Sequence, residues 1–222
     1  GWAAYANVGF DITEQLNVEL GVRYTEDKKD FGTLVVEPDS YLGPYFTYGF
    51  STDEYITDTQ KWDDTTFRGL VTYSPTDNSM IFASYTQGFK SGGYGSFWIE
   101  DANGNVPAYE TGITQSSGYL PGTFEPETAD SYEIGFKANY LDGRGSFDVV
   151  FFLYEYQDMQ VINYVDVDYD NDGVADAFSG RVLNVGQTDG EGVELSTTVA
   201  LNDHWTLYLA GGYLDTEATG LQ

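Results

Sequence analysis

The residues with the most suggestive chemistry lie in an acidic segment of the chain, Asp166-Val-Asp-Tyr-Asp-Asn-Asp-Gly-Val-Ala-Asp176. Carboxylates at alternate positions followed by a glycine resemble the first half of an EF-hand-type calcium loop, in which ligands come from positions 1, 3 and 5 and the glycine permits a sharp turn. This alignment predicts a Ca²⁺ site with four carboxylates and one backbone carbonyl, supplied by Asp168, Asp170, Asp172, Val174 and Asp176.

The calcium motif is incomplete at its far end. Position 12 is Ser179 where an EF-hand loop has a bidentate Glu, and no helix is predicted on either side of the segment. We therefore expect weak affinity, about 10⁻⁴ to 10⁻³ M, as in extracellular calcium modules. The alternative interpretation is a solvated acidic loop that binds no ion.

No combination of residues in the chain points to catalysis. The single histidine, His204, falls in a predicted turn, and no Ser/His/Asp or paired-Glu arrangement with a defined spacing is present. The glycines and lysine between Gly88 and Gly93 lack the Walker spacing and end a predicted strand, which argues against phosphate binding. The sequence predicts a protein that is not an enzyme.

Aromatic residues in the long, turn-rich segments are candidates for a different kind of site. Their rings offer flat, amphipathic surface to a small-molecule ligand. We expect such contacts from two clusters: Tyr45, Phe46, Tyr48, Tyr94, Phe97 and Trp98. The alternative is that these side chains only pack the loops together.

The element that dominates the sequence is one long hairpin. Residues 132–140 alternate strictly between apolar and polar, Asp142-Gly143 forms a turn signal, and residues 147–161 form a second run with almost no breaker. A strand over 147–161 would span roughly 50 Å at about 3.3 Å per residue, far longer than a typical soluble strand.

The same pattern recurs along the whole chain and predicts about eight strands. Short turns alternate with long connections, which occupy about residues 26–62, 90–123 and 164–180. Tight turns therefore collect at one end of the sheet and long loops at the other. A Greek-key sandwich gives no reason for that sorting, whereas an all-β, antiparallel transmembrane β-barrel has short periplasmic turns and long extracellular loops.

The residue types on the two strand faces support a barrel. Four aromatics lie at short turns on the apolar parity and are expected to form a girdle at one membrane interface: Phe10, Tyr73, Tyr140 and Trp205. The opposite parity carries charged residues that suit a wet lumen: Glu19, Arg23, Arg68, Glu133, Lys137 and Glu194. We expect apolar residues to face lipid and polar residues to face inward.

Three segments also carry a family resemblance. Residues 124–137, Phe-Glu-Pro-Glu-Thr-Ala-Asp-Ser-Tyr-Glu-Ile-Gly-Phe-Lys, resemble a strand signature of TonB-dependent outer-membrane receptors. Residues 184–195 resemble a second signature of these barrels, and residues 83–93 are similar to a segment of the iron-complex branch. The three occur in the family's order, and all are structural strand sequences.

The resemblance implies a bacterial outer-membrane location and a larger barrel of about 22 strands with a plug domain. Residues 1–222 would then be part of that one barrel domain, an internal fragment without the plug or the remaining strands. It also implies TonB-dependent uptake of a ferric siderophore or similar scarce nutrient. The expected partners are lipid, lipopolysaccharide, a small-molecule metal chelate and, through parts not in this chain, the TonB complex.

Two other functions fit the residues, namely a passive porin-type channel and a calcium-binding surface or adhesin β domain. Charge limits the partners in every case. The chain has 36 acidic and nine basic residues and a net charge of −27, and it has no basic stripe. We therefore expect no nucleic-acid partner, and we expect a small free anion to be a poor ligand.

Overall fold

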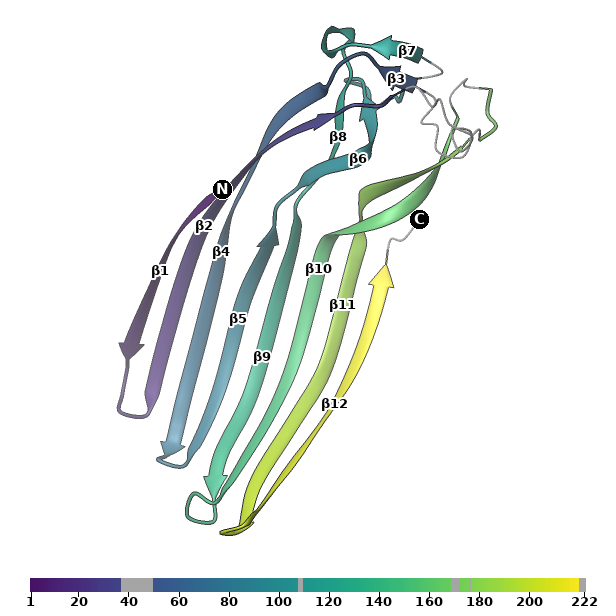
Figure 1. Cartoon of the computed structure of the whole chain (residues 1–222). Coiled ribbons are helices and arrows are strands. Elements are labelled where there is room, and N and C mark those ends of the chain that lie inside the picture. Colours follow the sequence, from purple (N-terminus) through teal and green to yellow (C-terminus); the bar gives the residue numbers. More distant parts are fainter. Residues whose placement is uncertain (37–49, 108–109, 169–171, 176, 220–222) are drawn as a thin grey trace.

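The computed structural model describes residues 1–36, 50–107, 110–168, 172–175 and 177–219. One antiparallel sheet of eight strands dominates it, with the strands side by side in chain order (Figure 1). These strands are β1 (Trp2–Asp11), β2 (Leu16–Thr33), β4 (Ile56–Thr76), β5 (Ser79–Lys90), β9 (Glu127–Tyr140), β10 (Gly145–Val167), β11 (Ala177–Asn202) and β12 (Trp205–Thr219).

The remaining elements gather at one end of this sheet (Figure 1). They are the parallel pair β3 (Phe50–Thr52) and β7 (Glu110–Ile113), the antiparallel pair β6 (Gly93–Glu100) and β8 (Leu120–Phe124), and a 3-10 turn η1 (Gln115–Ser117). No helix in the described part of the chain is long or apolar enough to cross a membrane.

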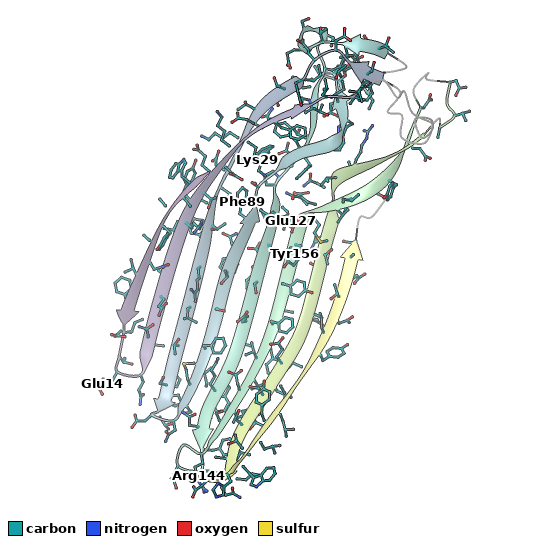
Figure 2. All side chains as sticks on the ribbon, in the orientation of Figure 1. Glu14, Lys29, Phe89, Glu127, Arg144 and Tyr156 are labelled. Atoms are coloured by element: carbon teal, nitrogen blue, oxygen red, sulfur yellow. The ribbon has the colours of Figure 1, made fainter. Side chains whose placement is uncertain are left out.

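The connections of the sheet are sorted by length, as the sequence predicts. The opposite end of the sheet holds only short turns, where Glu14 and Arg144 lie (Figure 2). In the turn between β9 and β10, Leu141, Asp142 and Gly143 have φ values of 53°, 52° and 83°, the left-handed backbone that tight hairpin turns favour. The long connections all lie at the other end.

The strand register separates an apolar face from a polar face. One row of directly paired residues crosses all eight strands on the apolar face: Phe10, Val18, Val71, Ala83, Ile134, Phe151, Val193 and Tyr213. A second row, three rungs further along the strands and on the polar face, is Asn7, Gly21, Arg68, Thr86, Ser131, Tyr154, Gly190 and Thr216. Every strand therefore keeps the alternation that its sequence predicts.

The apolar face has no second layer packed on it. Ile134 and Phe151, in the middle of the row, are 54% and 55% exposed. Leu195, Leu207 and Leu209 are exposed as well, whereas a sandwich would bury them. The sandwich interpretation is therefore excluded, and the predicted girdle aromatics Phe10, Tyr73, Tyr140 and Trp205 are exposed on this face too.

The strands extend further into the long connections than the sequence predicts. β2 continues to Thr33 and β4 begins at Ile56, so much of the predicted loop 26–62 is a hairpin. Likewise β10 and β11 pair as far as Val167 and Ala177, and the predicted loop 90–123 contains β6, β7 and β8. In β2 and β4 alternation is lost because both strand faces carry polar residues there, while backbone pairing continues.

Candidate functional site

A small buried core holds the long-connection end together. Phe50, Ile56, Ile99 and Ile113 form it, and each is at most 6% exposed. Phe50 and Ile56 come from the β2–β4 connection, and Ile99 and Ile113 from the β5–β9 connection, so the segments after β2 and after β5 fold as one unit. Val35, Val106 and Tyr119 pack against the same cluster.

The segment between β5 and β9 lies against the polar face of the extended β2–β4 hairpin. The ring of Tyr94, from β6, stacks on Phe31 with centroids 5.1 Å apart and meets Trp62 edge-on at 6.0 Å. The Tyr94 hydroxyl donates a hydrogen bond to Asp58 Oδ2 at 3.0 Å. Burial, and then this carboxylate, raise the pKa of Tyr94 above its usual value. The hydroxyl therefore stays protonated as a donor at physiological pH.

Lys29 fixes the start of the same segment. Its ammonium donates to the backbone oxygen of Gly92 and lies 5.5 Å from the centroid of the Trp62 ring. One residue earlier, the Ser91 hydroxyl donates to Asp27 Oδ2 at 2.9 Å. The position of β6 over the polar face thus depends on one cation, two carboxylates and two aromatic rings of β2 and β4.

Trp98 is the buried anchor of β6. It is 4% exposed, and its indole Nε1 donates to Glu100 Oε2 at 3.2 Å. The guanidinium of Arg181, from β11, lies 5.3 Å from the centroid of its ring. A Cβ atom at Gly95 or Gly122 would collide with the indole, so only glycine allows the backbone to approach so closely.

The structure describes the side chains of only two of the six predicted ligand-contact residues. Tyr94 is half-buried and Trp98 is buried, both on β6. The side chain of Phe97 lies outside the described part of the structure, as do residues Tyr45, Phe46 and Tyr48. A role in ligand contact stays a prediction for all six.

Sequence reasoning missed several residues of this site. The sequence predicts a loop for Phe31, Trp62, Asp58 and Lys29, because charged residues on both strand faces hide the alternation around them. Trp62 and Lys29 are identifiable only once the β2–β4 register places them on one face. No sequence signal pairs Arg181 with Trp98.

The predicted calcium ligands are only partly described. Asp168 Oδ2 accepts the backbone N–H of Gly173 at 2.8 Å, and Asp172 Oδ1 accepts that of Val174 at 2.8 Å. Both carboxylates thus cap the turn of their own loop. Asp170 and Asp176 lie outside the described residues, and among those described no three Asp, Glu, His or Cys side chains converge as metal ligands. Calcium binding stays a prediction.

Residues 1–221 match the family described as TonB dependent receptor-like, beta-barrel. The chain belongs to this family. Its members are receptors and transporters of the bacterial outer membrane and are not enzymes, so the eight-stranded sheet is a part of an outer-membrane barrel wall. The apolar face is turned to lipid, the polar face to the lumen, and the long connections to the outside.

Curated relatives of the chain include receptors for iron complexes. It is 29% identical over 123 residues to a hemin receptor of Yersinia pestis, covering 54% of this chain and 18% of that protein. It is 27% identical over 157 residues to a probable TonB-dependent siderophore receptor, PiuA, of Acinetobacter baumannii, covering 71% and 18%. The chain therefore spans about a fifth of the length of these relatives.

Solved structures show the same fold. The ferric yersiniabactin uptake receptor FyuA of Yersinia pestis superposes with a TM-score of 0.65 at 19% identity, over 98% of this chain and 27% of that one. The copper transporter OprC superposes with a TM-score of 0.66 at 13% identity, over 98% and 29%. These two proteins carry different metals, so the shared fold does not identify a cargo.

Proposed function

We propose that the protein containing this chain is a TonB-dependent outer-membrane transporter that takes up a ferric siderophore or a similar iron complex. The observation that carries the proposal is that Tyr94 and Trp98, in the segment between β5 and β9, lie over the lumen-facing side of a receptor-family barrel wall. The hemin and siderophore receptors among the relatives support iron complexes as the cargo class.

The transport step involves binding and release without any bond breaking. Aromatic rings at the outer end offer flat surface to an organic chelate. The plug domain and the contact to TonB belong to parts outside this chain, and the energy for release enters through them. The role of this chain is to bind the iron complex and to form part of the wall of the transport path.

The acidic charge of the chain further limits which ligands it can bind. Carboxylates far outnumber cations, and the basic residues near the candidate site are already engaged, Lys29 with Gly92 and Lys90 with Glu127 at 3.1 Å. A neutral or cationic chelate therefore approaches more readily than a small free anion. An uptake assay in which a small free anion competes best would contradict this part of the proposal.

Lipopolysaccharide is the proposed lipid partner, and two lysines are its candidate contacts. Lys28 and Lys61 lie directly opposite each other on the lipid-facing side of β2 and β4, just beyond the Trp2–Tyr24 ring contact. Each pairs with a carboxylate, Lys61 with Glu26 at 2.7 Å and Lys28 with Asp30 at 3.6 Å. Exposed pairs of this kind contribute only about 0–1 kcal/mol, so a lipid phosphate competes for them.

Uptake in cells tests the main proposal. The full-length protein is expressed in a host that lacks its own iron-complex receptors, and entry of radiolabelled hemin and of a ferric siderophore is measured with and without TonB. We expect uptake of at least one complex that disappears without TonB. Uptake independent of TonB would support the porin alternative, and a protein that stays soluble without detergent would support the adhesin alternative.

A further inference from the structure

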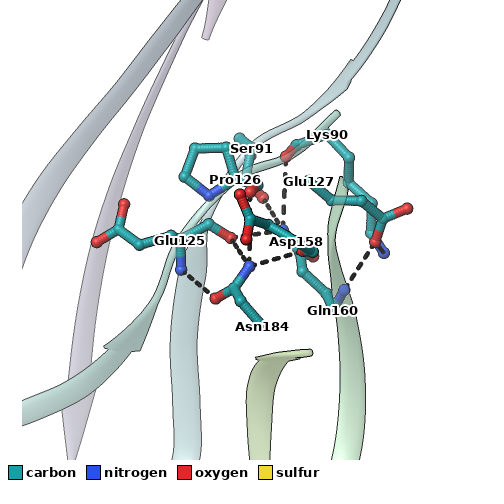
Figure 3. A network of polar contacts seen from close by, with 8 residues as sticks. All are labelled: Lys90, Ser91, Glu125, Pro126, Glu127, Asp158, Gln160 and Asn184. Atoms are coloured by element: carbon teal, nitrogen blue, oxygen red, sulfur yellow. Dashed lines mark hydrogen bonds and ion pairs between the residues drawn. The ribbon is translucent and has the colours of Figure 1, made fainter. Parts of the chain in front are cut away.

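Two amide side chains of the β10–β11 hairpin hold both ends of the segment between β5 and β9 (Figure 3). Gln160, on β10, donates from Nε2 to the backbone oxygens of Ser91 and Glu125, each at 3.0 Å. Ser91 is where the chain leaves β5, and Glu125 is where it returns towards β9. One side chain therefore ties together the entry and the exit of a segment of more than 30 residues.

Asn184, on β11, binds the exit of the segment a second time. Its Nδ2 donates to the oxygen of Glu125 at 2.8 Å, and its Oδ1 accepts the Glu125 N–H at 2.7 Å. Glu125 and Pro126 lie between β8 and β9 and belong to neither strand. The amide of Asn184 thus satisfies the backbone of Glu125 as a neighbouring strand would.

A charged contact completes the network. The backbone N–H of Gln160 donates to Glu127 Oε2 at 2.9 Å, and the same carboxylate oxygen lies 3.1 Å from the ammonium of Lys90. Lys90 and Glu127 are the last residue of β5 and the first of β9, and they are directly paired in the sheet. The network is therefore anchored on the barrel wall.

The β10–β11 hairpin changes direction at this level (Figure 1). Its register runs without a shift from Gly145 opposite Val199 to Val167 opposite Ala177. At the single unpaired rung, Asp158 and Gly186 face each other with φ values of 54° and 43°. Two left-handed residues in one rung bend both strands together, and Asn184 Nδ2 satisfies the displaced oxygen of Asp158 at 2.8 Å.

Above this bend the hairpin meets the segment again, because Arg181 lies over the ring of Trp98. The contacts of Gln160 and Asn184 fix the segment at its ends, and that of Arg181 fixes it in its middle. The same amide, Asn184, contacts both the bend and Glu125.

We propose that Gln160 and Asn184 are positioning residues that couple the bend of the β10–β11 hairpin to the segment between β5 and β9, and so hold that segment over the lumen. They act on the ligand through the position of this segment, and do not touch it. The importance of this coupling for uptake rests on the proposed function, whereas the coupling itself does not.

Amide hydrogen exchange of the full-length protein in detergent tests the coupling. The variants Gln160→Leu and Asn184→Leu remove the donors at nearly constant side-chain size, and Asn184→Asp keeps only the acceptor for the Glu125 N–H. Matched controls are Gln157→Leu and Gln187→Leu. These amides lie one rung below the bend, and their Nε2 atoms donate to carboxylates of their own strands, Glu155 at 2.6 Å and Asp189 at 2.9 Å.

We expect exchange in β6 and β8 to rise by about tenfold or more in the two Leu variants, because each variant loses at least two hydrogen bonds to the backbone of the segment. Exchange in β5 and β9 should not change, and Asn184→Asp should give an intermediate rise. A rise confined to the wall strands, or an equal rise in the controls, would overturn the positioning role. So would unchanged exchange in β6 and β8.

Hemin titration of the same proteins gives the second readout. A positioning role predicts faster hemin release from Gln160→Leu and Asn184→Leu, with an unchanged number of sites and with parent behaviour in the controls. If the parent protein binds neither hemin nor a ferric siderophore, the proposed function fails, while the exchange experiment still decides the coupling. If hemin release is unchanged although β6 and β8 have loosened, the segment does not govern the ligand.

Discussion

At the scale of single residues, Asp101 shows how the outer segment is kept in shape. Its carboxylate accepts the backbone N–H groups of Asn103 at 2.8 Å and of Asn105 at 2.9 Å, and the side-chain amide of Asn105 at 3.1 Å. The bond from the Asn105 backbone, followed by that from its side chain, lowers the pKa of Asp101 to about 2. The ionised carboxylate therefore reinforces a turn that two backbone hydrogen bonds also close, from Asp101 N–H to Asn105 O and from Gly104 N–H to Asp101 O, each at 3.0 Å.

This lowered pKa predicts an acid-sensitive turn. The stabilisation is complete above the usual pKa of an aspartate, near 3.9, and is lost as the pH falls through about 2. We expect pepsin cleavage around residues 101–105 of the full-length protein to increase between pH 4 and pH 2. Asp101→Asn should be cleaved at pH 4 already and should show little further change. Identical pH profiles for parent and variant would contradict the role of this carboxylate.

A second prediction at the residue scale concerns the calcium site. Without an ion, the carboxylates between Asp166 and Asp176 repel one another, and Asp168 and Asp172 already cap their own turn. We expect calcium to protect this loop from exchange with a midpoint of about 10⁻⁴ to 10⁻³ M. The double variant Asp170→Asn with Asp172→Asn should lose that response, and equal protection in both proteins would rule the site out.

At the scale of elements, the sequence predicts the parts of the strands that cross the lipid and misses the parts above it. Around Ile134 and Phe151 one face is apolar and the other polar, so period-two alternation is visible. From Glu26 to Asp30 every side chain is charged, so β2 has no visible period although its backbone stays paired. The β6–β8 unit could not be predicted, because its core joins residues as distant as Phe50 and Ile113.

The two faces of the wall predict different tolerance to charge. Ile134→Arg places a guanidinium on the lipid-facing row, at a cost of about 2–4 kcal/mol near the bilayer midplane. Ser84→Arg, on the adjacent rung of β5 and facing the lumen, is the matched control. We expect a lower urea midpoint for Ile134→Arg in lipid vesicles and a near-parent midpoint for Ser84→Arg. Equal losses in the two variants would contradict the assignment of faces.

Glycines of the wall predict a second effect at this scale. On the lumen-facing side, a Cβ atom at Gly135 would collide with the ring of Phe82 on the neighbouring strand. Gly135→Val should therefore displace this ring and destabilise the β5–β9 pair, whereas Gly211→Ala adds a methyl group where no atom lies within 4 Å. Tryptic resistance of the folded protein should fall only for Gly135→Val, and a resistant variant would show that Phe82 rotates away freely.

At the scale of the whole molecule, the sheet has two edges, β1 and β12. Unpaired backbone groups in lipid cost several kcal/mol each, so both edges require a strand beside them. The larger barrel of the family provides those neighbours, which is the reason we expect residues 1–222 to be part of one domain. The alternative is that these eight strands close on themselves.

Refolding of residues 1–222 alone distinguishes the two cases. We expect the isolated chain in detergent to give no compact, heat-modifiable band on a gel, and the full-length protein to give one, because only the latter pairs β1 and β12. A compact monomeric band from the isolated chain would show that eight strands close by themselves. Cross-linked dimers would indicate that two open sheets pair edge to edge.

The unshifted ladder of β10 and β11 restricts how this region can change in evolution. Deleting one residue from either strand above the bend would turn the side chains beyond it on that strand to the opposite face, and a deletion in β11 between Arg181 and the bend would separate Arg181 from Trp98. Insertions and deletions in variants of this protein should therefore collect at the hairpin tip around residues 168–176, or occur as matched pairs on both strands. The outermost surface can then vary in sequence, for instance to escape phages or antibodies. Gln160, Asn184 and Arg181, which contact the segment between β5 and β9, meanwhile stay in register.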